Sequence, residues 1–412
     1  MDATFYAEHL LAARRPGHSL PQGLYSDAAI FDLDVSLIYH REWLFAGHTC
    51  EVPEAGDFLT LRVGAAEAVI VRGADGVVRA FHNTCRHRGS RICQKDRGSA
   101  ARLVCPYHQW TYDLEGRLLF ARDMGPAFDP SAHGLKPVHC ETVAGYIFVC
   151  FAAIAPDFAP VKARIAPYMV PHGLENAKVA YQTTIVEKGN WKLVWENNRE
   201  CYHCSGSHPE LCRTFSDAPT ITGVERAETD QSLAQHWARC EAAGLPSTFF
   251  LSGDGQYRVM RSPLLRETES FTLSGKPACA RPLGDIAVPR IGSMLLFHYP
   301  STWNHLLRDH ATSFQVTPLS PQETQVTTKW LVHKDAVEGV DYDLKTLTEV
   351  WNATNDQDRR LVEQNQLGIN SPAYEPGPYA PEHENGTGQF VDWYCATLAS
   401  RLQEGGRLAA AE

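Results

Sequence analysis

Short runs with period two dominate the chain from about residue 57. The segments FLTLRV, EAVIVR and VVRAFHN alternate apolar and polar positions and are separated by VGAA and by the turn signal GADG. Such alternation predicts half-buried antiparallel strands joined by tight turns. YDLEGRLL and ETVAGYIFVCF extend the pattern, and the turn-rich APDFAP follows at 155–160. We therefore predict a compact antiparallel all-β domain over 45–152.

The pattern changes after this domain. GNWKLVWENNRECYHC predicts a helix with Asn190 as its N-cap and with Trp191, Val194 and Trp195 as a buried stripe. The helical pattern continues through the cysteines and histidines at the end of this segment.

Strands and helices then alternate to the end of the chain. Apolar alternation returns within 286–334, and long helices are predicted over 341–367 and 388–403. Residues 1–44 are expected to pack with a second domain that occupies 153–412. The predicted fold class is α+β, with a small antiparallel all-β domain inserted in a larger domain of a helix-flanked antiparallel sheet.

Composition supports two globular domains. The chain has 412 residues, more than one hydrophobic core usually fills, and is 44% hydrophobic and 21% charged. It has no apolar run of about 20 residues, and its N-terminal segment lacks the residue order of a secretory signal. A net charge of −10 without a basic cluster argues against nucleic acid as a partner. We expect a cytoplasmic protein that binds neither nucleic acid nor membrane.

Four residues in the all-β domain form the first candidate metal site. TCRHRGSRIC supplies Cys85 and His87, and VCPYHQW supplies Cys105 and His108. Two thiolates and two imidazoles could hold a structural zinc ion or a Rieske [2Fe–2S] cluster. Cysteine and histidine alternate here within a β domain, unlike in a zinc finger, which favours the cluster. Cys93 fits no ligand position and is interpreted as a packing residue.

These segments resemble the C-x-H and C-x-x-H motifs of Rieske proteins. The CPYHQW form is typical of Rieske oxygenases, although Gln109 stands where glycine is commoner. The resemblance implies that Cys85, His87, Cys105 and His108 bind the cluster.

The segment ECYHCSGSH at 200–208 is the second candidate site. On the predicted helix Asn197, Glu200 and His203 share one face, and His208 follows after the helix ends. Two histidines and one carboxylate would form a facial triad for ferrous iron. Cys201 and Cys204 could instead be a redox dithiol or half of a zinc site, but without a second C-x-x-C or a thioredoxin-like context we interpret both as buried packing residues.

The carboxylate ligand is expected on the helix over 341–367. Asp358 is the first choice because it shares a helical face with Trp351 and Val362, and Asp356 is the alternative.

The whole chain resembles the α subunit of Rieske non-heme iron oxygenases. The resemblance implies that Glu200, in a position where aspartate is commoner, bridges His203 to the cluster ligand His108 of a neighbouring subunit. It also implies a homo-oligomer, expected to be a trimer. Because the chain has no nucleotide-binding fingerprint, a separate flavin/iron–sulfur reductase is expected to deliver the electrons of NAD(P)H.

The segments NWKLVWENNRECYHC and HPELCRTF resemble the branch that acts on quaternary ammonium compounds. This implies a monooxygenase that consumes O2, N-demethylates a small cationic betaine and releases formaldehyde, with proline betaine (stachydrine) expected first and glycine betaine next. Aromatic faces can bind such cations. The residues considered for this role are Trp195, Tyr202, Phe249, Phe250, Phe297, Tyr299 and Trp303.

Four alternatives stay open at this point. The protein could hydroxylate a ring substrate, act on choline or carnitine, serve only as a Rieske electron carrier, or be a zinc protein with a hydrolytic site at 203–208. The carrier hypothesis leaves the second histidine pair unexplained.

Overall fold

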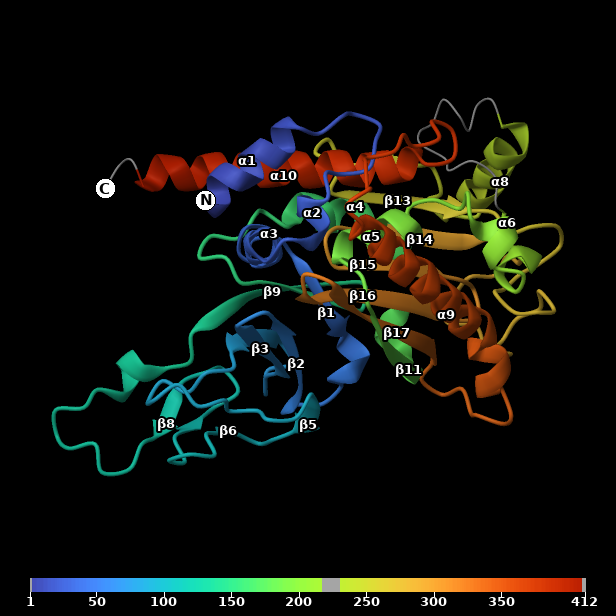
Figure 1. Ribbon diagram of the computed structural model, residues 1–412. Coiled ribbons are helices and arrows are strands. Elements are labelled where there is room, and N and C mark those ends of the chain that lie inside the picture. The colour runs from blue at the N-terminus through green and yellow to red at the C-terminus, as the bar shows by residue number, and fades with distance from the viewer. Residues whose placement is uncertain (1, 217–229, 410–412) are drawn as a thin grey trace. The chain divides into compact units, whose positions relative to one another are not determined.

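The chain divides into two compact units, one inserted in the sequence of the other (Figure 1). The computed structural model describes residues 2–216 and 230–409, with side chains as far as residue 404. One unit comprises Met1–Ile38 and Ala163–Glu412, and the other comprises Tyr39–Lys162. The predicted fold class, a small antiparallel all-β domain inserted in a larger α+β domain, is confirmed.

The inserted unit contains two antiparallel sheets. The larger sheet has the order β1-β10-β9-β4-β3-β2-β5, and the smaller has the order β6-β7-β8. The strands are β1 (Leu44–His48), β2 (Asp57–Val63), β3 (Ala66–Arg72), β4 (Val78–His82), β5 (Arg97–Ser99), β6 (Leu103–Val104), β7 (Thr111–Tyr112), β8 (Leu118–Phe120), β9 (Pro137–Val143) and β10 (Tyr146–Cys150). Phe58, Val69 and Phe81 from β2, β3 and β4 share one apolar core with Cys85 and Cys105.

The larger unit is built on one antiparallel sheet with the order β11-β17-β16-β15-β14-β13-β12. Its strands are β11 (Ala177–Glu187), β12 (Phe250–Leu251), β13 (Tyr257–Ser262), β14 (Ser293–His298), β15 (Thr302–Leu306), β16 (Ala311–Ser320) and β17 (Glu323–His333). Every residue of β14 and β15 is buried. These central strands are therefore covered on both faces.

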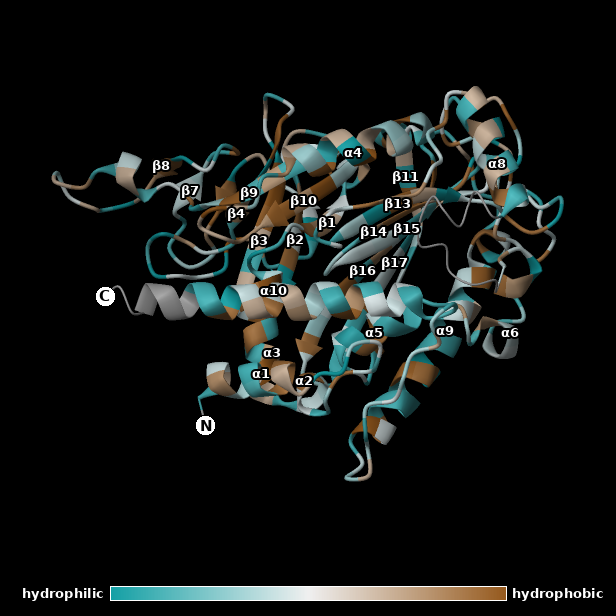
Figure 2. Ribbon diagram, turned by 90° about the horizontal axis from the view of Figure 1, so that it is seen from above, coloured by the Kyte–Doolittle hydropathy of each residue, from teal (hydrophilic) through white to brown (hydrophobic). Residues whose placement is uncertain are grey.

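Helices cover the sheet of the larger unit. The helices are α1 (Ala3–Ala12), α2 (Gly23–Ser26), α3 (Ala28–Leu33), α4 (Ala159–Met169, which crosses the unit boundary), α5 (Trp191–Asn198), α6 (Cys204–Ser207), α8 (Gln231–Ala242), α9 (Leu344–Ile369) and α10 (Asn385–Ala409). α5 contacts α9, α10, β16 and β17, and α9 also contacts β11. Apolar and polar residues alternate along α9 and α10, as expected for helices with one buried face (Figure 2). Both long helices predicted near the C-terminus are present.

α5 begins as the sequence predicts but ends earlier. The Asn190 side chain accepts a hydrogen bond from the backbone N–H of Lys192 at 3.0 Å, so Asn190 is the N-cap. Trp191, Val194 and Trp195 are buried. The prediction of one helix through residues 200–204 is wrong, because α5 ends at Asn198 and the Glu200 side chain accepts the Tyr202 backbone N–H that a continuous helix would use.

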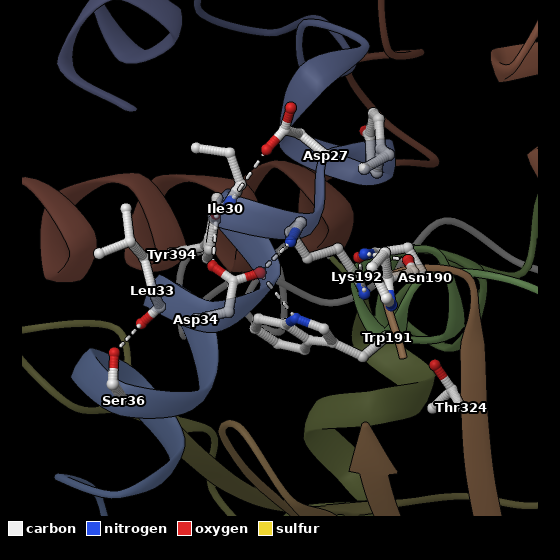
Figure 3. Close-up of polar contacts among 12 residues, drawn as sticks. Asp27, Ile30, Leu33, Asp34, Ser36, Asn190, Trp191, Lys192, Thr324 and Tyr394 are labelled. Carbon is white, nitrogen blue, oxygen red and sulfur yellow. Dashed lines mark hydrogen bonds and ion pairs between the residues drawn. The ribbon is translucent and has the colours of Figure 1, made fainter. Parts of the chain in front are cut away.

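A buried ion pair fixes α5 to the N-terminal segment and to α10 (Figure 3). Asp34 and Lys192 are both fully buried and paired. Asp34 also accepts hydrogen bonds from the Trp191 indole at 3.0 Å and from the Tyr394 hydroxyl at 2.9 Å. The helix that leads into ECYHCSGSH is thus held by segments from both ends of the chain.

Within the described part of the chain, no helix combines the length and the apolar character that a bilayer span requires.

Candidate functional site

The cysteine and histidine quartet of the inserted unit converges on one place. Cys85 and His87 lie in the loop between β4 and β5, and Cys105 and His108 lie in the tight turn between β6 and β7. Both thiols are buried in the same core, and the Nδ1 atoms of the two imidazoles are 3.2 Å apart. Two sulfur and two nitrogen donors are therefore presented together, as a Rieske cluster requires.

Neighbouring side chains hold these two loops. The Tyr112 hydroxyl lies 3.4 Å from Cys85 Sγ and accepts the backbone N–H of Arg86 at 3.0 Å. The His87 ring stacks on Trp110 with centroids 4.9 Å apart. Gln109 has a φ of 62°, in the left-handed region, which explains why glycine suits this position. Cys93 is buried in the same core, as predicted for a packing residue.

A second set of donors converges in the larger unit. His203 Nε2 and His208 Nε2 are 3.0 Å apart and lie 3.3 and 3.0 Å from Asp358 Oδ1. His203 precedes α6, His208 follows it, and Asp358 projects from α9. Asp358 Oδ1 is buried and accepts no hydrogen bond of ordinary geometry from the described residues. Three donor atoms that face one another in this way fit a shared metal ion.

The outer nitrogen of each imidazole in this second set is also anchored. His203 Nδ1 lies 2.5 Å from Glu200 Oε1, and His208 Nδ1 lies 2.8 Å from Gln357 Oε1. A carboxylate or amide oxygen can only accept, so each Nδ1 carries the proton and each Nε2 keeps its lone pair for a metal. Gln357 was not predicted, and only its place beside Asp358 in the sequence hinted at this role.

Electrostatics around the histidines favour a bound cation. Burial lowers the pKa of His203, but the nearby carboxylates of Asp358 and Glu200 outweigh burial and raise it to about 9. Burial likewise opposes a positive charge on His208, yet Asp358 and Gln357 raise its pKa as well. The donors therefore lie in a negative potential, which a metal cation would neutralise.

The structure separates the two aspartates that the sequence left as alternatives. Asp356 points away from the histidines and pairs with Arg359 and Arg360, at 2.6 and 2.5 Å. Only Asp358 meets His203 and His208. The two aspartates, two positions apart on α9, project from different faces of the helix.

Cys201 and Cys204 are joined by a disulfide, with Cα atoms 4.9 Å apart. The prediction that both are packing residues is therefore wrong, because the turn that ends α5 brings the two sulfurs together. Cys204 Sγ lies close to His203 and His208, but a sulfur in a disulfide is not a thiolate ligand.

A cavity of about 500 Å³ opens beside His203, His208 and Asp358. Asn197 and Glu200 line it at the end of α5, as do Phe297 from β14 and Trp351 from α9. Its volume is typical of a small-molecule site.

Most aromatic residues considered for the substrate site lie outside this cavity. Among them only Phe297 lines it; Trp195, Trp303 and Tyr299 are buried, Tyr202 is 61% exposed, and Phe250 packs under Arg164. Phe249 is buried and does not line the cavity either. The aromatic lining comes instead from Phe215, His305 and Trp351, which the sequence alone did not single out because three distant segments supply them.

Comparison with known families identifies the class. Residues 174–400 match the family described as ring hydroxylating alpha subunit (catalytic domain), and residues 42–136 match the Rieske [2Fe–2S] domain. The chain belongs to the Rieske non-heme iron oxygenases, as an oxygenase subunit. These two domains imply a Rieske [2Fe–2S] cluster, a mononuclear iron and a separate reductase.

The chain is similar along most of its length to named oxygenase subunits. The chain is 52% identical to the glycine betaine monooxygenase oxygenase subunit of Pseudomonas aeruginosa, over 96% of this chain and 92% of that protein. It is 48% identical to the protein of the same name from Chromohalobacter salexigens, over 95% and 88%. The quaternary ammonium Rieske monooxygenase CntA has the same fold, with a TM-score of 0.72, 21% identity and coverage of 95% and 98%.

Proposed function

We propose that this protein is the oxygenase subunit of a monooxygenase that removes an N-methyl group from a quaternary ammonium betaine, with glycine betaine as the first substrate to test. The observation that carries the proposal is a two-histidine, one-carboxylate donor set at the wall of a small-molecule cavity. The relatives that bear the name glycine betaine monooxygenase support this choice of substrate. Proline betaine, which the sequence placed first, stays a prediction.

The proposal assigns two ligand sets. Cys85, His87, Cys105 and His108 hold the cluster, because their sulfur and nitrogen donors converge. His203, His208 and Asp358 hold the mononuclear iron. Ferrous iron in such a triad keeps open positions and supplies oxygen activation.

The chain's own residues then have distinct tasks. Glu200 and Gln357 orient the two imidazoles and fix their tautomers. The cavity holds the substrate beside the triad and limits access of water. Insertion of oxygen into a C–H bond of the N-methyl group gives a carbinolamine, which breaks its C–N bond to release formaldehyde and the demethylated amine. The second oxygen atom leaves as water after uptake of two electrons from the reductase and two protons from solvent.

The assembly is also part of the proposal. We expect a homotrimer in which Glu200 links His203 to His108 of the partner subunit, so that electrons cross between subunits. The short contact between Glu200 and His203 supports the first half of this bridge. Inter-subunit electron transfer has likewise been described for the solved structure of CntA.

Single-turnover release of formaldehyde tests the proposed function. Iron-replete protein would be reduced chemically and exposed to oxygen with glycine betaine, proline betaine, carnitine, choline or an aromatic acid. Formaldehyde from glycine betaine, in an amount close to the mononuclear iron content, is the expected result. Reoxidation of the cluster without formaldehyde from any amine would refute the demethylation, and hydroxylation of the aromatic acid would replace it.

A further inference from the structure

Two buried arginines line the same cavity as the histidine donors. Arg199 follows α5 and is 1% exposed, and Arg258 lies on β13 and is 5% exposed. Their guanidinium carbons stand over the ring of Phe297, at 4.6 and 4.4 Å from its centroid. Phe297 therefore already binds two cations through its ring, so it is a poor partner for a third. Both guanidinium groups thus contact the same ring.

Arg199 keeps one donor unused. Its Nε donates to the Tyr299 hydroxyl, and one terminal nitrogen donates to Gln389 Oε1 at 3.2 Å. The other terminal nitrogen, Nη1, is buried and has no hydrogen-bond partner among the described residues. Nor does Arg199 form an ion pair within the part of the chain that the structure describes. A buried guanidinium in this state is stabilised by an anion that enters the cavity.

The second positive charge, on Arg258, also favours an anion in the cavity. Burial, and next the charge of Arg199, lower the pKa of Arg258 well below its ordinary value. Two like charges buried in one cavity repel each other, which favours an anion beside the unpartnered Nη1 of Arg199.

Other residues that line the cavity favour a cation. Asp358 and Glu200 place carboxylates at the histidine end of the cavity. His305 stacks on Trp351 with ring centroids 4.5 Å apart, and burial lowers the pKa of His305 to about 3, so its ring is neutral. Neutral aromatic faces beside carboxylates suit a quaternary ammonium group, which has no N–H to donate.

The sheet register relates Arg258 to His305. Arg258 pairs with Phe297, whereas His305 pairs with Leu295, two residues along β14. Arg258 and His305 thus share one sheet face, two strands and two residues apart, or roughly 12 Å between Cα atoms. Side chains that reach inward from both positions leave space for a short zwitterion.

We propose that Arg199 and Arg258 bind the carboxylate of the betaine and thereby direct its methylammonium group toward His203, His208 and Asp358. This inference rests on the proposed function and adds a specificity determinant to it. It predicts that the enzyme selects quaternary amines that carry a carboxylate close to the nitrogen.

The test compares glycine betaine with choline, which has the same trimethylammonium group but a hydroxyl in place of the carboxylate. Formaldehyde release and calorimetric binding would be measured for the wild type, Arg258→Gln and Arg258→Lys. Arg164→Gln is the matched control, because it removes an exposed guanidinium outside the cavity. Cluster absorption and iron content verify that each variant is folded.

Arg258→Gln should weaken binding of glycine betaine and raise its KM by about 10- to 100-fold, the range for a lost charge-assisted hydrogen bond. Binding of choline should change by less than about twofold, and Arg258→Lys should recover part of the loss because it keeps the charge. Equal losses for both substrates, or unchanged binding of glycine betaine, would overturn the inference while the demethylation stands. If Arg258→Gln does not fold, Arg258→Lys decides the test. This variant should bind glycine betaine more weakly than the wild type does, and it should bind choline as tightly as the wild type does. A wild type that demethylates neither amine would instead refute the proposed function, and calorimetry with glycine betaine would still decide whether the arginines bind its carboxylate.

Discussion

Asp34→Ala should destabilise the larger unit severely, because it removes the partner of a buried lysine. Asp34 and Lys192 are fully buried, and Asp34 also accepts hydrogen bonds from Trp191 and Tyr394 (Figure 3). Burial already lowers the pKa of Lys192, and Asp34 is the main group that opposes this. Loss of one partner of a buried pair costs about 3–5 kcal/mol, since the other charge is left unpaired.

This free energy corresponds to a measurable shift in melting temperature. At about 2 °C per kcal/mol for a unit of this size, Asp34→Ala should lower Tm by roughly 6–10 °C. Far-UV circular dichroism would follow the melting, and absorption of the Rieske cluster would report on the inserted unit separately. α5, which Lys192 anchors, leads directly into the metal donors, so retention of mononuclear iron should fall as well.

The double variant Asp34→Ala/Lys192→Met is the decisive control. It removes both charges, so it should be more stable than Asp34→Ala alone by about 2 kcal/mol or more. A double variant as unstable as the single one would show that lost hydrogen bonds, not an unpaired charge, cause the effect. A Tm for Asp34→Ala within about 2 °C of the wild type would refute the reasoning entirely.

Three further predictions concern the site and its helix. Asp358→Ala should lose most mononuclear iron but keep cluster absorption, whereas Asp356→Ala should keep both; iron analysis that shows the reverse would reassign the ligand. Glu200→Ala should retain both metal centres but abolish formaldehyde release coupled to cluster oxidation, because it breaks the proposed link from His203 to His108 of the partner subunit; normal coupled turnover would contradict this. Glu196 is buried, which raises its pKa from 4.5 to about 7 despite hydrogen bonds from Tyr25 and Tyr379. Its contribution to stability is therefore complete below pH 4.5 and is lost as pH rises through about 7, a change of about 3 kcal/mol. Between about pH 5 and pH 8 the Tm of the wild type should fall relative to that of Glu196→Gln, and parallel profiles would disprove the assignment.

Local sequence patterns determined much of the fold because their causes are local. Period-two alternation marked β2, β3 and β4, and the side chain of Asn190 capped α5 as its residue type predicts. The candidate cluster donors could also be recognised in the sequence, because each cysteine and its histidine lie within one short loop. The pair His203 and His208 was found for the same reason, although the helix predicted to carry His203 ends at Asn198.

Only the tertiary structure could decide contacts between residues that are distant along the chain. The choice between Asp358 and Asp356 depends on the rotation of α9 against the histidine turn. Periodicity made Asp358 the first choice but did not remove Asp356 as an alternative. The disulfide of Cys201 and Cys204 depends on a turn that the helical pattern concealed.

The residues that line the cavity likewise could be found only from the tertiary structure. Arg199, Arg258 and Trp351 come from the end of a helix, a strand and another helix, and in sequence each resembles an ordinary surface or core residue. Burial and proximity give them their chemistry: a guanidinium or a carboxylate acquires a role only when the fold removes it from water and places its counterpart nearby. The sequence by itself therefore predicted two candidate metal sites and the class of enzyme. The tertiary structure decided which aspartate faces the histidines and which charged residues line the cavity.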